Sequence, residues 1–230
     1  MNGYESRSKE LPQKGLIDAE AWLFDLDNTL YPAASNLFDQ IDQRMGAYIS
    51  KLLGISRRHA RDLQKRYYRD HGTTLNGLML NHDVDPDAYL EYVHDIDLTV
   101  IGAAPSLATV LSELPGRKIV FTNGSAAHAD RVMTKLGIGN YFEGIQDIKA
   151  SEYKPKPDRA AYQSVISRFG LMPRSLIMVD DIPANLEPAS ALGATTVWVR
   201  NDRWARNFEG DYIDHVTDNL VEWLGRLVAV

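Results

Sequence analysis

The sequence predicts an α/β protein with a three-layer core, in which helices cover both faces of a parallel sheet, and with an all-helical segment inserted after the first strand. Two observations support this prediction. From residue 101 onward, short apolar runs alternate with segments of helical periodicity, and strands separated by helices favour right-handed crossovers into a parallel sheet. Between residues 36 and 100, only helical periodicity is present.

The first predicted strand, Ala21–Phe24, is an apolar run that ends at carboxylates. Helical spacing then begins at Leu37 and stops at Gly54. Three further helices are predicted at 56–71, at 74–81 and from Asp85 onward. Because this block follows the first strand directly, we expect it to lie above the C-terminal end of that strand, where open α/β sheets bind ligands.

Strands and helices alternate in the rest of the chain. The predicted strands are 118–122, 144–148, 176–179 and 195–199, and the predicted helices are 125–136, 158–169 and 184–192. The predicted domains are a flexible N-terminal arm (1–18), a catalytic core (19–35 and 101–230) and a helical cap (36–100).

The composition narrows the class of protein. A chain of 230 residues with 44% hydrophobic residues can bury a substantial core. The net charge of −6 argues against general nucleic-acid binding and leaves a phosphorylated small molecule open. The lack of cysteine excludes disulfides, thiolate catalysis and Cys-ligated zinc. Without a secretory signal, or a run near the roughly 20 apolar residues that span a bilayer, we expect a cytoplasmic protein with no membrane partner.

Asp25 and Asp27 follow the first strand. Residues two apart on an extended chain point to the same side. Two carboxylates at such a short separation repel each other, so the pair requires a cation or a shared proton. The alternative is a polar turn that caps a helix.

Two other turns carry candidate phosphate-binding groups. Thr122 and Asn123 lie between an apolar strand and a helix, where a hydroxyl, an amide and free backbone N–H groups can bind an anion. Lys154 lies in a loop stiffened by Pro155 and Pro157, and its ammonium can neutralise a phosphoryl group. The alternatives are an ordinary helix N-cap and a solvated loop.

Asp180 and Asp181 end another apolar strand, at the edge of the sheet where Asp25 is expected. Carboxylate oxygens from two strand ends suit Mg²⁺. A helix cap is an alternative for one of these acids.

These segments, in this order, resemble the motifs of the haloacid dehalogenase-like hydrolase superfamily, read here as Asp25-Leu26-Asp27-Asn28-Thr29, Thr122, Lys154 and Asp180-Asp181. The resemblance extends from Trp22 to Val199 and implies a Rossmann-like core with an inserted cap. It also implies a Mg²⁺-dependent phosphatase with an aspartyl-phosphate intermediate.

The resemblance assigns a role to each residue. Asp25 is the nucleophile, and Asp27 protonates the leaving oxygen and then deprotonates the attacking water. Thr122, Asn123 and Lys154 bind the phosphoryl group. The metal site comprises Asp25, the Asp27 carbonyl and the pair Asp180 and Asp181, of which Asp181 is favoured as the direct ligand. Asn185 stands near the position where many relatives carry a further acid, and is expected to hold the metal through water.

More narrowly, the segments 28–32, 179–185 and 72–78 resemble the pyrimidine 5′-nucleotidase branch of the superfamily. The predicted cap also carries a group of tyrosines beside a basic stretch at 57–69. These tyrosines are Tyr48, Tyr67, Tyr68, Tyr89 and Tyr92. A base can stack on an aromatic face, so a pyrimidine nucleoside monophosphate is the expected substrate.

Other functions stay open. A phosphatase for phosphoglycolate or a sugar phosphate, and a phosphomutase, would use the same aspartates. A dehalogenase ranks lower because it has no use for Asp27 as a leaving-group acid. A non-enzymatic alternative is a nucleic-acid or protein-binding module through the basic stretch, although a charged helix face is most often simply solvated. None of the six histidines is assigned to chemistry, because they show no metal-ligand spacing. The oligomeric state is not predicted.

Overall fold

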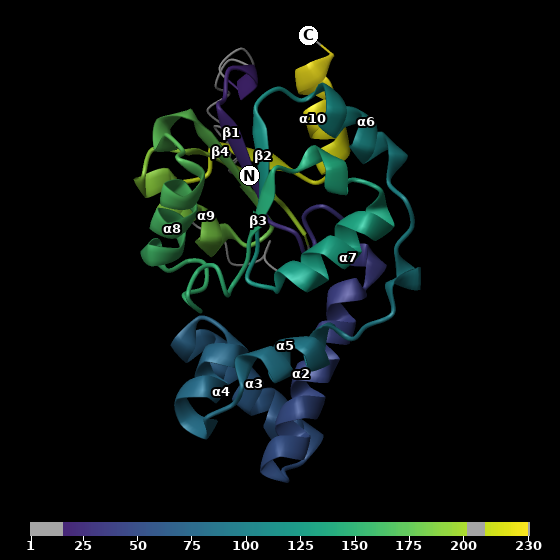
Figure 1. Cartoon of the computed structure of the whole chain (residues 1–230), viewed down its shortest axis with the longest axis vertical. Helices are drawn as coiled ribbons and strands as arrows, with labels where there is room; N and C mark the ends of the chain where they lie inside the picture. The colour runs from purple at the N-terminus through teal and green to yellow at the C-terminus, as the bar shows by residue number, and fades with distance from the viewer. Residues whose placement is uncertain (1–15, 202–209, 230) are drawn as a thin grey trace, which may run out of the picture.

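The structure is a computed structural model that describes residues 16–201 and 210–229. Its core is a six-stranded sheet in the order β3-β2-β1-β4-β5-β6, with every neighbouring pair parallel (Figure 1). The strands are β1 (Ala21–Phe24), β2 (Arg117–Phe121), β3 (Gly144–Gln146), β4 (Leu176–Asp180), β5 (Thr195–Val199) and β6 (His215–Thr217). The first strand of the chain therefore lies in the interior of the sheet, between β2 and β4.

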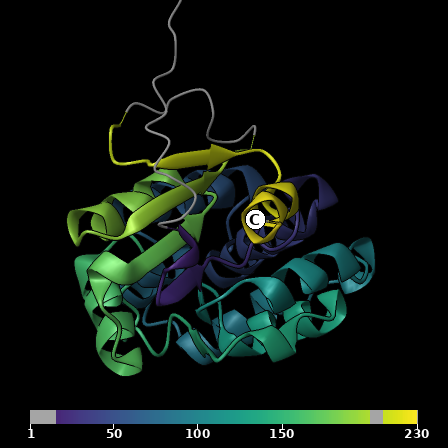
Figure 2. The same cartoon turned by 90° about the horizontal axis from the view of Figure 1, so that it is seen from above.

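Helices cover both faces of this sheet, as Figure 2 shows from above. The core helices are α6 (Pro105–Glu113), α7 (Ala126–Leu136), α8 (Arg159–Phe169), α9 (Pro183–Ala191) and α10 (Leu220–Val228). Alternate residues of β1 point to opposite faces. Trp22 and Phe24 pack in one apolar cluster with α6, α7 and α10. Ala21 and Leu23 pack in a second cluster with α8 and α9. The predicted three-layer α/β core is confirmed.

Four helices occupy the chain between β1 and α6, and in Figure 1 they form a separate lobe beyond one end of the core. They are α2 (Leu37–Leu53), α3 (Arg57–His71), α4 (Thr74–His82) and α5 (Pro86–His94). Local capping explains their boundaries. Gly54 ends α2 in the left-handed conformation, and the Ser56 and Asp85 side chains cap the N-termini of α3 and α5. The helices match the predicted ones, and the division into a core and a cap stays a prediction.

The sequence prediction missed α6, β6 and α10. The signal for α10 was present, because Leu220, Trp223, Leu224 and Leu227 follow helical spacing and are buried. The predicted flexible arm lies mostly outside the described residues. Its last part differs from the prediction, since Leu16 is buried in the core cluster. No helix within the described ranges has the length and apolar character needed to cross a membrane.

Candidate active site

The register of the sheet brings the predicted site residues to one edge. Phe24, the last residue of β1, pairs with Val120 of β2 and with Val179 of β4. Asp25 therefore leaves the sheet between the ends of two parallel neighbours. Thr122 directly follows β2, and Asp180 is the last residue of β4, so residues far apart in the sequence meet at the C-terminal edge.

A buried lysine joins two of the acids, and it is Lys156 rather than Lys154. Its Nζ donates to Asp25 Oδ1 at 2.8 Å, to Asp180 Oδ2 at 2.7 Å and to the Phe121 carbonyl at 2.7 Å. The Lys156 side chain is 1% exposed. The Lys154 side chain is 51% exposed and lies 3.7 Å from Glu152. The assignment of Lys154 to the site was therefore wrong.

Asn123 explains why the second lysine of the loop faces the acids. Its side chain donates to the Lys156 carbonyl at 3.1 Å and accepts from the Lys156 backbone N–H at 2.8 Å. These two bonds fix the backbone of Lys156 beside the strand ends. Asn123 thus holds the loop through its side chain, a role that the sequence around it does not indicate. Thr122 is buried, and its hydroxyl accepts from the Gly124 N–H at 2.9 Å.

Asp25, Asp180 and Asp181 form a cluster of carboxylates whose nearest oxygens all lie within 4.8 Å of one another. Burial, partly offset by Lys156, raises the pKa of Asp25 to about 7. Burial and the neighbouring acids Asp25 and Asp180 also raise the pKa of Asp181 well above its ordinary value. Among the described residues, a single ammonium, that of Lys156, contacts two of these three carboxylates, so the cluster has an excess of negative charge that a bound cation would relieve.

Asp180 and Asp181 differ in how their oxygens are used. Both oxygens of Asp180 accept from Asn185 Nδ2, at 3.0 and 3.1 Å, and Asp180 also accepts from Lys156 and from the Ile182 N–H. Asp181 accepts from Asn201 Nδ2 at 2.8 Å and lines the cavity described below. The geometry therefore favours Asp181 as the direct ligand of a cation. The side chain of Asn185 is directed at Asp180 instead.

Asp27 lies beside Asp25 and has its own partners. Its Oδ1 accepts from the Tyr31 hydroxyl at 2.6 Å and lies 2.9 Å from His128 Nε2. Burial on its own would raise the pKa of Asp27, but His128 and Tyr31 outweigh it and hold the pKa below its ordinary value. Asp27 is thus in a different electrostatic environment from Asp25, whose pKa is raised.

Two histidines belong to the site, although the spacing of the histidines in the sequence predicted a role for none of them. His128 contacts Asp27, and its ring stacks on that of His94 with a centroid separation of 4.3 Å and an interplanar angle of 8°. His128 lies in the first turn of α7, three residues after its cap Ser125, so the helix that follows Thr122 could have pointed to it. His94 is the last residue of α5, and no local signal connects it to the core.

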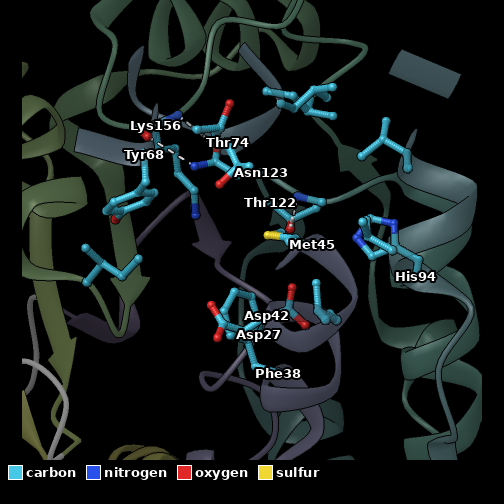
Figure 3. Close-up of a pocket in the computed structure, with 18 of the residues that line it drawn as sticks. Asp27, Phe38, Asp42, Met45, Tyr68, Thr74, His94, Thr122, Asn123 and Lys156 are labelled. Carbon is cyan, nitrogen blue, oxygen red and sulfur yellow. Dashed lines mark hydrogen bonds between the residues drawn. The ribbon is translucent and has the colours of Figure 1, made fainter. Parts of the chain in front are cut away.

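A cavity of about 310 Å³ lies between the strand ends and the helical block. Figure 3 shows Asp27, Thr122, Asn123 and Lys156 among its lining residues, together with side chains of the helical block. The apolar and aromatic part of the lining comprises Phe38, Ile41, Met45, Leu75, Tyr89, Leu90, Val93, Ile148 and Ile182. The polar groups from the helices include Asp42, Gln64, Lys65, Tyr68, Thr73 and Thr74.

Fewer of the cap tyrosines line the cavity than the sequence suggested. Of the five tyrosines, Tyr68 and Tyr89 line the cavity. Tyr48 and Tyr92 pack edge-on within the helical block, and Tyr67 is buried with its hydroxyl 2.7 Å from His82. These three tyrosines serve the packing of the helices.

Comparison with known proteins places the chain in a family. A profile of the haloacid dehalogenase-like hydrolases matches residues 19–193. Phosphate metabolism protein 8 of Saccharomyces cerevisiae is 26% identical over 192 residues, which cover 76% of this chain and 59% of the yeast protein. This chain thus spans less than two thirds of that relative's length. Glyceraldehyde 3-phosphate phosphatase of Methanocaldococcus jannaschii is 24% identical over 217 residues, covering 87% of this chain and 93% of that protein.

Solved structures share the fold. A HAD phosphatase from Thermococcus onnurineus superposes with a TM-score of 0.61 at 20% identity, over 90% of this chain and 97% of that one. L-2-haloacid dehalogenase from Xanthobacter autotrophicus gives a TM-score of 0.58 at 16% identity, over 92% and 98%. At these identities the likeness concerns the fold alone. Because the family profile covers most of the sequence, the chain belongs to the haloacid dehalogenase-like hydrolase family.

Proposed function

We propose that the protein is a Mg²⁺-dependent phosphomonoester hydrolase in which Asp25 is the nucleophile. The observation that supports this most directly is the position of Lys156, whose ammonium contacts both Asp25 and Asp180 beside the cavity, with Asp181 in the same cluster. A nucleophilic carboxylate and a counter-charge for an anionic substrate are thus in one place.

Electrostatics explain why the lysine is required. A carboxylate and a phosphate oxygen about 4 Å apart repel by roughly 4 kcal/mol per charge pair at an effective dielectric constant near 20. The ammonium of Lys156 offsets part of this repulsion, because it is fixed beside Asp25 before the substrate arrives. The Thr29 hydroxyl donates to the other oxygen of Asp25 at 3.0 Å, so each oxygen of the carboxylate accepts a hydrogen bond that fixes its orientation.

The residues present fit a magnesium ion. Three buried carboxylates with hard oxygen donors meet within 4.8 Å, and burial together with the neighbouring acids raises the pKa of Asp25 and of Asp181. Asp25 and Asp181 would hold the ion, with the backbone carbonyl of Asp27, and Asp180 would act mainly through its bonds to Lys156 and Asn185. When bound, Mg²⁺ neutralises and orients the phosphate and keeps Asp25 ionised.

Asp27 supplies the acid–base chemistry. An oxygen of Asp25 forms a bond to phosphorus while the bond from phosphorus to the leaving oxygen breaks, and the proton of Asp27 passes to that oxygen. Asp27 then takes a proton from the water that attacks the aspartyl phosphate, which releases inorganic phosphate and restores Asp25. The two donors on Asp27 Oδ1 favour its carboxylate form, which is the form that takes a proton from the attacking water.

We infer further that the substrate is a pyrimidine nucleoside 5′-monophosphate. Tyr68, Tyr89 and Phe38 offer aromatic surface in the cavity, and Asp42 and Gln64 offer polar groups that can bond to a base. The resemblance of segments 28–32, 72–78 and 179–185 to the pyrimidine 5′-nucleotidase branch favours the same substrate. A small sugar phosphate is the second candidate, because the relative from M. jannaschii is named a glyceraldehyde 3-phosphate phosphatase.

A phosphate-release screen tests both levels of the proposal. Wild-type protein and Asp25→Asn are assayed with Mg²⁺ on nucleoside monophosphates, phosphoglycolate, glyceraldehyde 3-phosphate and hexose phosphates. We expect kcat/KM to be highest for UMP or CMP, and Asp25→Asn to lose turnover by several orders of magnitude. If a non-nucleotide ester exceeds every nucleotide by about tenfold, the nucleotidase assignment fails and the phosphatase assignment stands. If no ester releases phosphate, both fail.

A further inference from the structure

Asp27 is held at one of its two carboxylate oxygens. Oδ1 accepts from the Tyr31 hydroxyl at 2.6 Å and from His128 at 2.9 Å. An ionised carboxylate offers only acceptors, so the Nε2 of His128 is the donor. Within the described residues, no hydrogen bond reaches Oδ2. Since Asp27 lines the cavity, Oδ2 is the oxygen left to meet a ligand.

The ring of His128 is itself rigidly placed. Its side chain is 0% exposed, and one face stacks on His94. The Ser125 hydroxyl accepts from the backbone N–H of His128 at 3.3 Å and lies 3.0 Å from His94 Nδ1. Arg131, on the same helix as His128, donates to the His94 carbonyl at 2.9 Å. The end of α5 is therefore fastened to the helix that carries His128, and the ring has little freedom to rotate.

Tyr31 is equally constrained. It is 2% exposed and lies four residues after Asp27. Burial and the charge of Asp27 raise the pKa of Tyr31 well above its ordinary value, so its hydroxyl stays protonated and remains a donor. Two donors from different elements, one beside β1 and one on α7, thus converge on a single oxygen.

We propose that Tyr31 and His128 are positioning residues of the reaction: they occupy Oδ1 of Asp27 and leave Oδ2 as the oxygen that exchanges a proton with the leaving group and with water. This inference rests on the proposed function. The terminal torsion of an aspartate is broad, so a carboxyl group without partners samples many orientations. A general acid acts only when its proton lies within hydrogen-bond reach of the leaving oxygen. Fixing Oδ1 keeps the proton on the cavity side.

In the first half of the reaction, an oxygen of Asp25 bonds to phosphorus, the bond from phosphorus to the leaving oxygen breaks, and the proton on Oδ2 moves to that oxygen. In the second half, a proton of the attacking water moves to Oδ2 as the water oxygen bonds to phosphorus and the bond between phosphorus and Asp25 breaks. Oδ1 keeps its two donors throughout, so neither Tyr31 nor His128 gains or loses a proton. Their effect is on the orientation of Asp27.

The test uses the dependence of the loss on the leaving group. His128→Leu and Tyr31→Phe each remove one donor, whereas His128→Gln keeps an N–H group close to the position of Nε2. Each variant is assayed on 4-nitrophenyl phosphate, whose leaving group needs little protonation, and on the best alkyl phosphate from the screen above. We expect His128→Leu and Tyr31→Phe to lower kcat/KM for the alkyl ester at least about tenfold more than for the aryl ester, and His128→Gln to recover most of the difference.

Matched controls come from the helical block. Tyr67 and His82 form a bond of the same kind, at 2.7 Å, outside the cavity lining. Tyr67→Phe and His82→Leu should therefore show no dependence on the leaving group. Equal losses on both esters for His128→Leu and Tyr31→Phe, or no loss, would overturn the inference. If His128→Leu does not fold, Tyr31→Phe decides the question, because it keeps the ring and removes only the hydroxyl.

The same assay separates this inference from the proposed function. Asp27→Asn should show the same pattern with a larger amplitude. If Asp27→Asn shows no leaving-group dependence, the acid–base role of Asp27 in the proposed function is wrong. If Asp27→Asn shows the dependence while the Tyr31 and His128 variants do not, the proposed function stands and the positioning role is wrong.

Discussion

Lys156 reaches Asp25 across 131 residues of sequence, with its Nζ 2.8 Å from the Oδ1 of the aspartate. Lys154, two residues earlier, points to solvent and lies 3.7 Å from Glu152. The two lysines have the same neighbour, Pro155, and the same side-chain chemistry. What distinguishes them is that Asn123 binds the backbone of Lys156 on both its N–H and its carbonyl.

The two lysines give a direct comparison. We expect Lys156→Met to lower kcat/KM by about 10²-fold or more, because a fixed charge beside the reacting phosphate is lost. The variant should also unfold at a lower temperature, since removing one partner of a buried ion pair costs roughly 3–5 kcal/mol. Lys154→Met should change both quantities little, as its side chain is half exposed. Phosphate release and thermal unfolding with Mg²⁺ present are the measurements, and comparable losses in the two variants would contradict the assignment.

Metal binding is expected to stabilise the fold through Asp181. A ligand at 100 times its Kd adds about 2.7 kcal/mol to the free energy of unfolding, so Mg²⁺ should raise the Tm of the wild-type protein measurably. Asp181→Asn should remove most of this shift. Asp218→Asn is the control, because it removes a carboxylate that is 66% exposed and pairs with Arg200. EDTA should abolish phosphate release, and Mg²⁺ should restore it. Full activity in EDTA would be incompatible with the mechanism.

His94 is expected to make the stability depend on pH. Burial and the neighbouring His128 lower the pKa of His94 from 6.5 to about 3. Below pH 6.5 the unfolded chain takes up a proton at His94 and the folded chain does not, so the stabilisation present at higher pH is lost as the pH falls. At pH 5 this loss is about 2 kcal/mol. His94→Phe keeps a stacked ring without the titration, so it should lose less stability than the wild-type protein between pH 7.5 and pH 5. Urea unfolding at both pH values measures the difference, and identical losses would contradict it.

The packing of α3 on α4 depends on a glycine. A Cβ added at Gly77 would lie 2.3 Å from Cγ of Tyr67, which is closer than side chains can approach without movement. Gly77→Ala should therefore lower the free energy of unfolding by roughly 1–3 kcal/mol, the usual cost of overpacking. Gly102→Ala is the control, since nothing lies within 4 Å of its added Cβ. A Gly77→Ala protein as stable as the wild type would show that Tyr67 can give way.

Much of the fold and part of the site could be predicted from the sequence because their signals are local. The helices between residues 36 and 100 are indicated by the periodicity of their apolar residues and by caps such as Ser56, Asp85 and Gly54. Asp25 and Asp181 follow apolar runs directly, and parallel strands bring their ends to one edge. The short edge strand β6, His215–Thr217, has no such signal, because three residues of mixed polarity show no period.

The sequence by itself determined which acids lie at the strand ends, since a polar residue that directly follows a buried strand emerges at the edge of the sheet. Only the tertiary structure decided which lysine contacts these acids. It also decided that His128 contacts Asp27 and stacks on His94. The direction of a side chain in a loop depends on what binds the backbone there, and for Lys156 that partner is Asn123. His94 and His128 stack because the end of α5 lies against α7, and that contact leaves no trace in the local pattern of either helix.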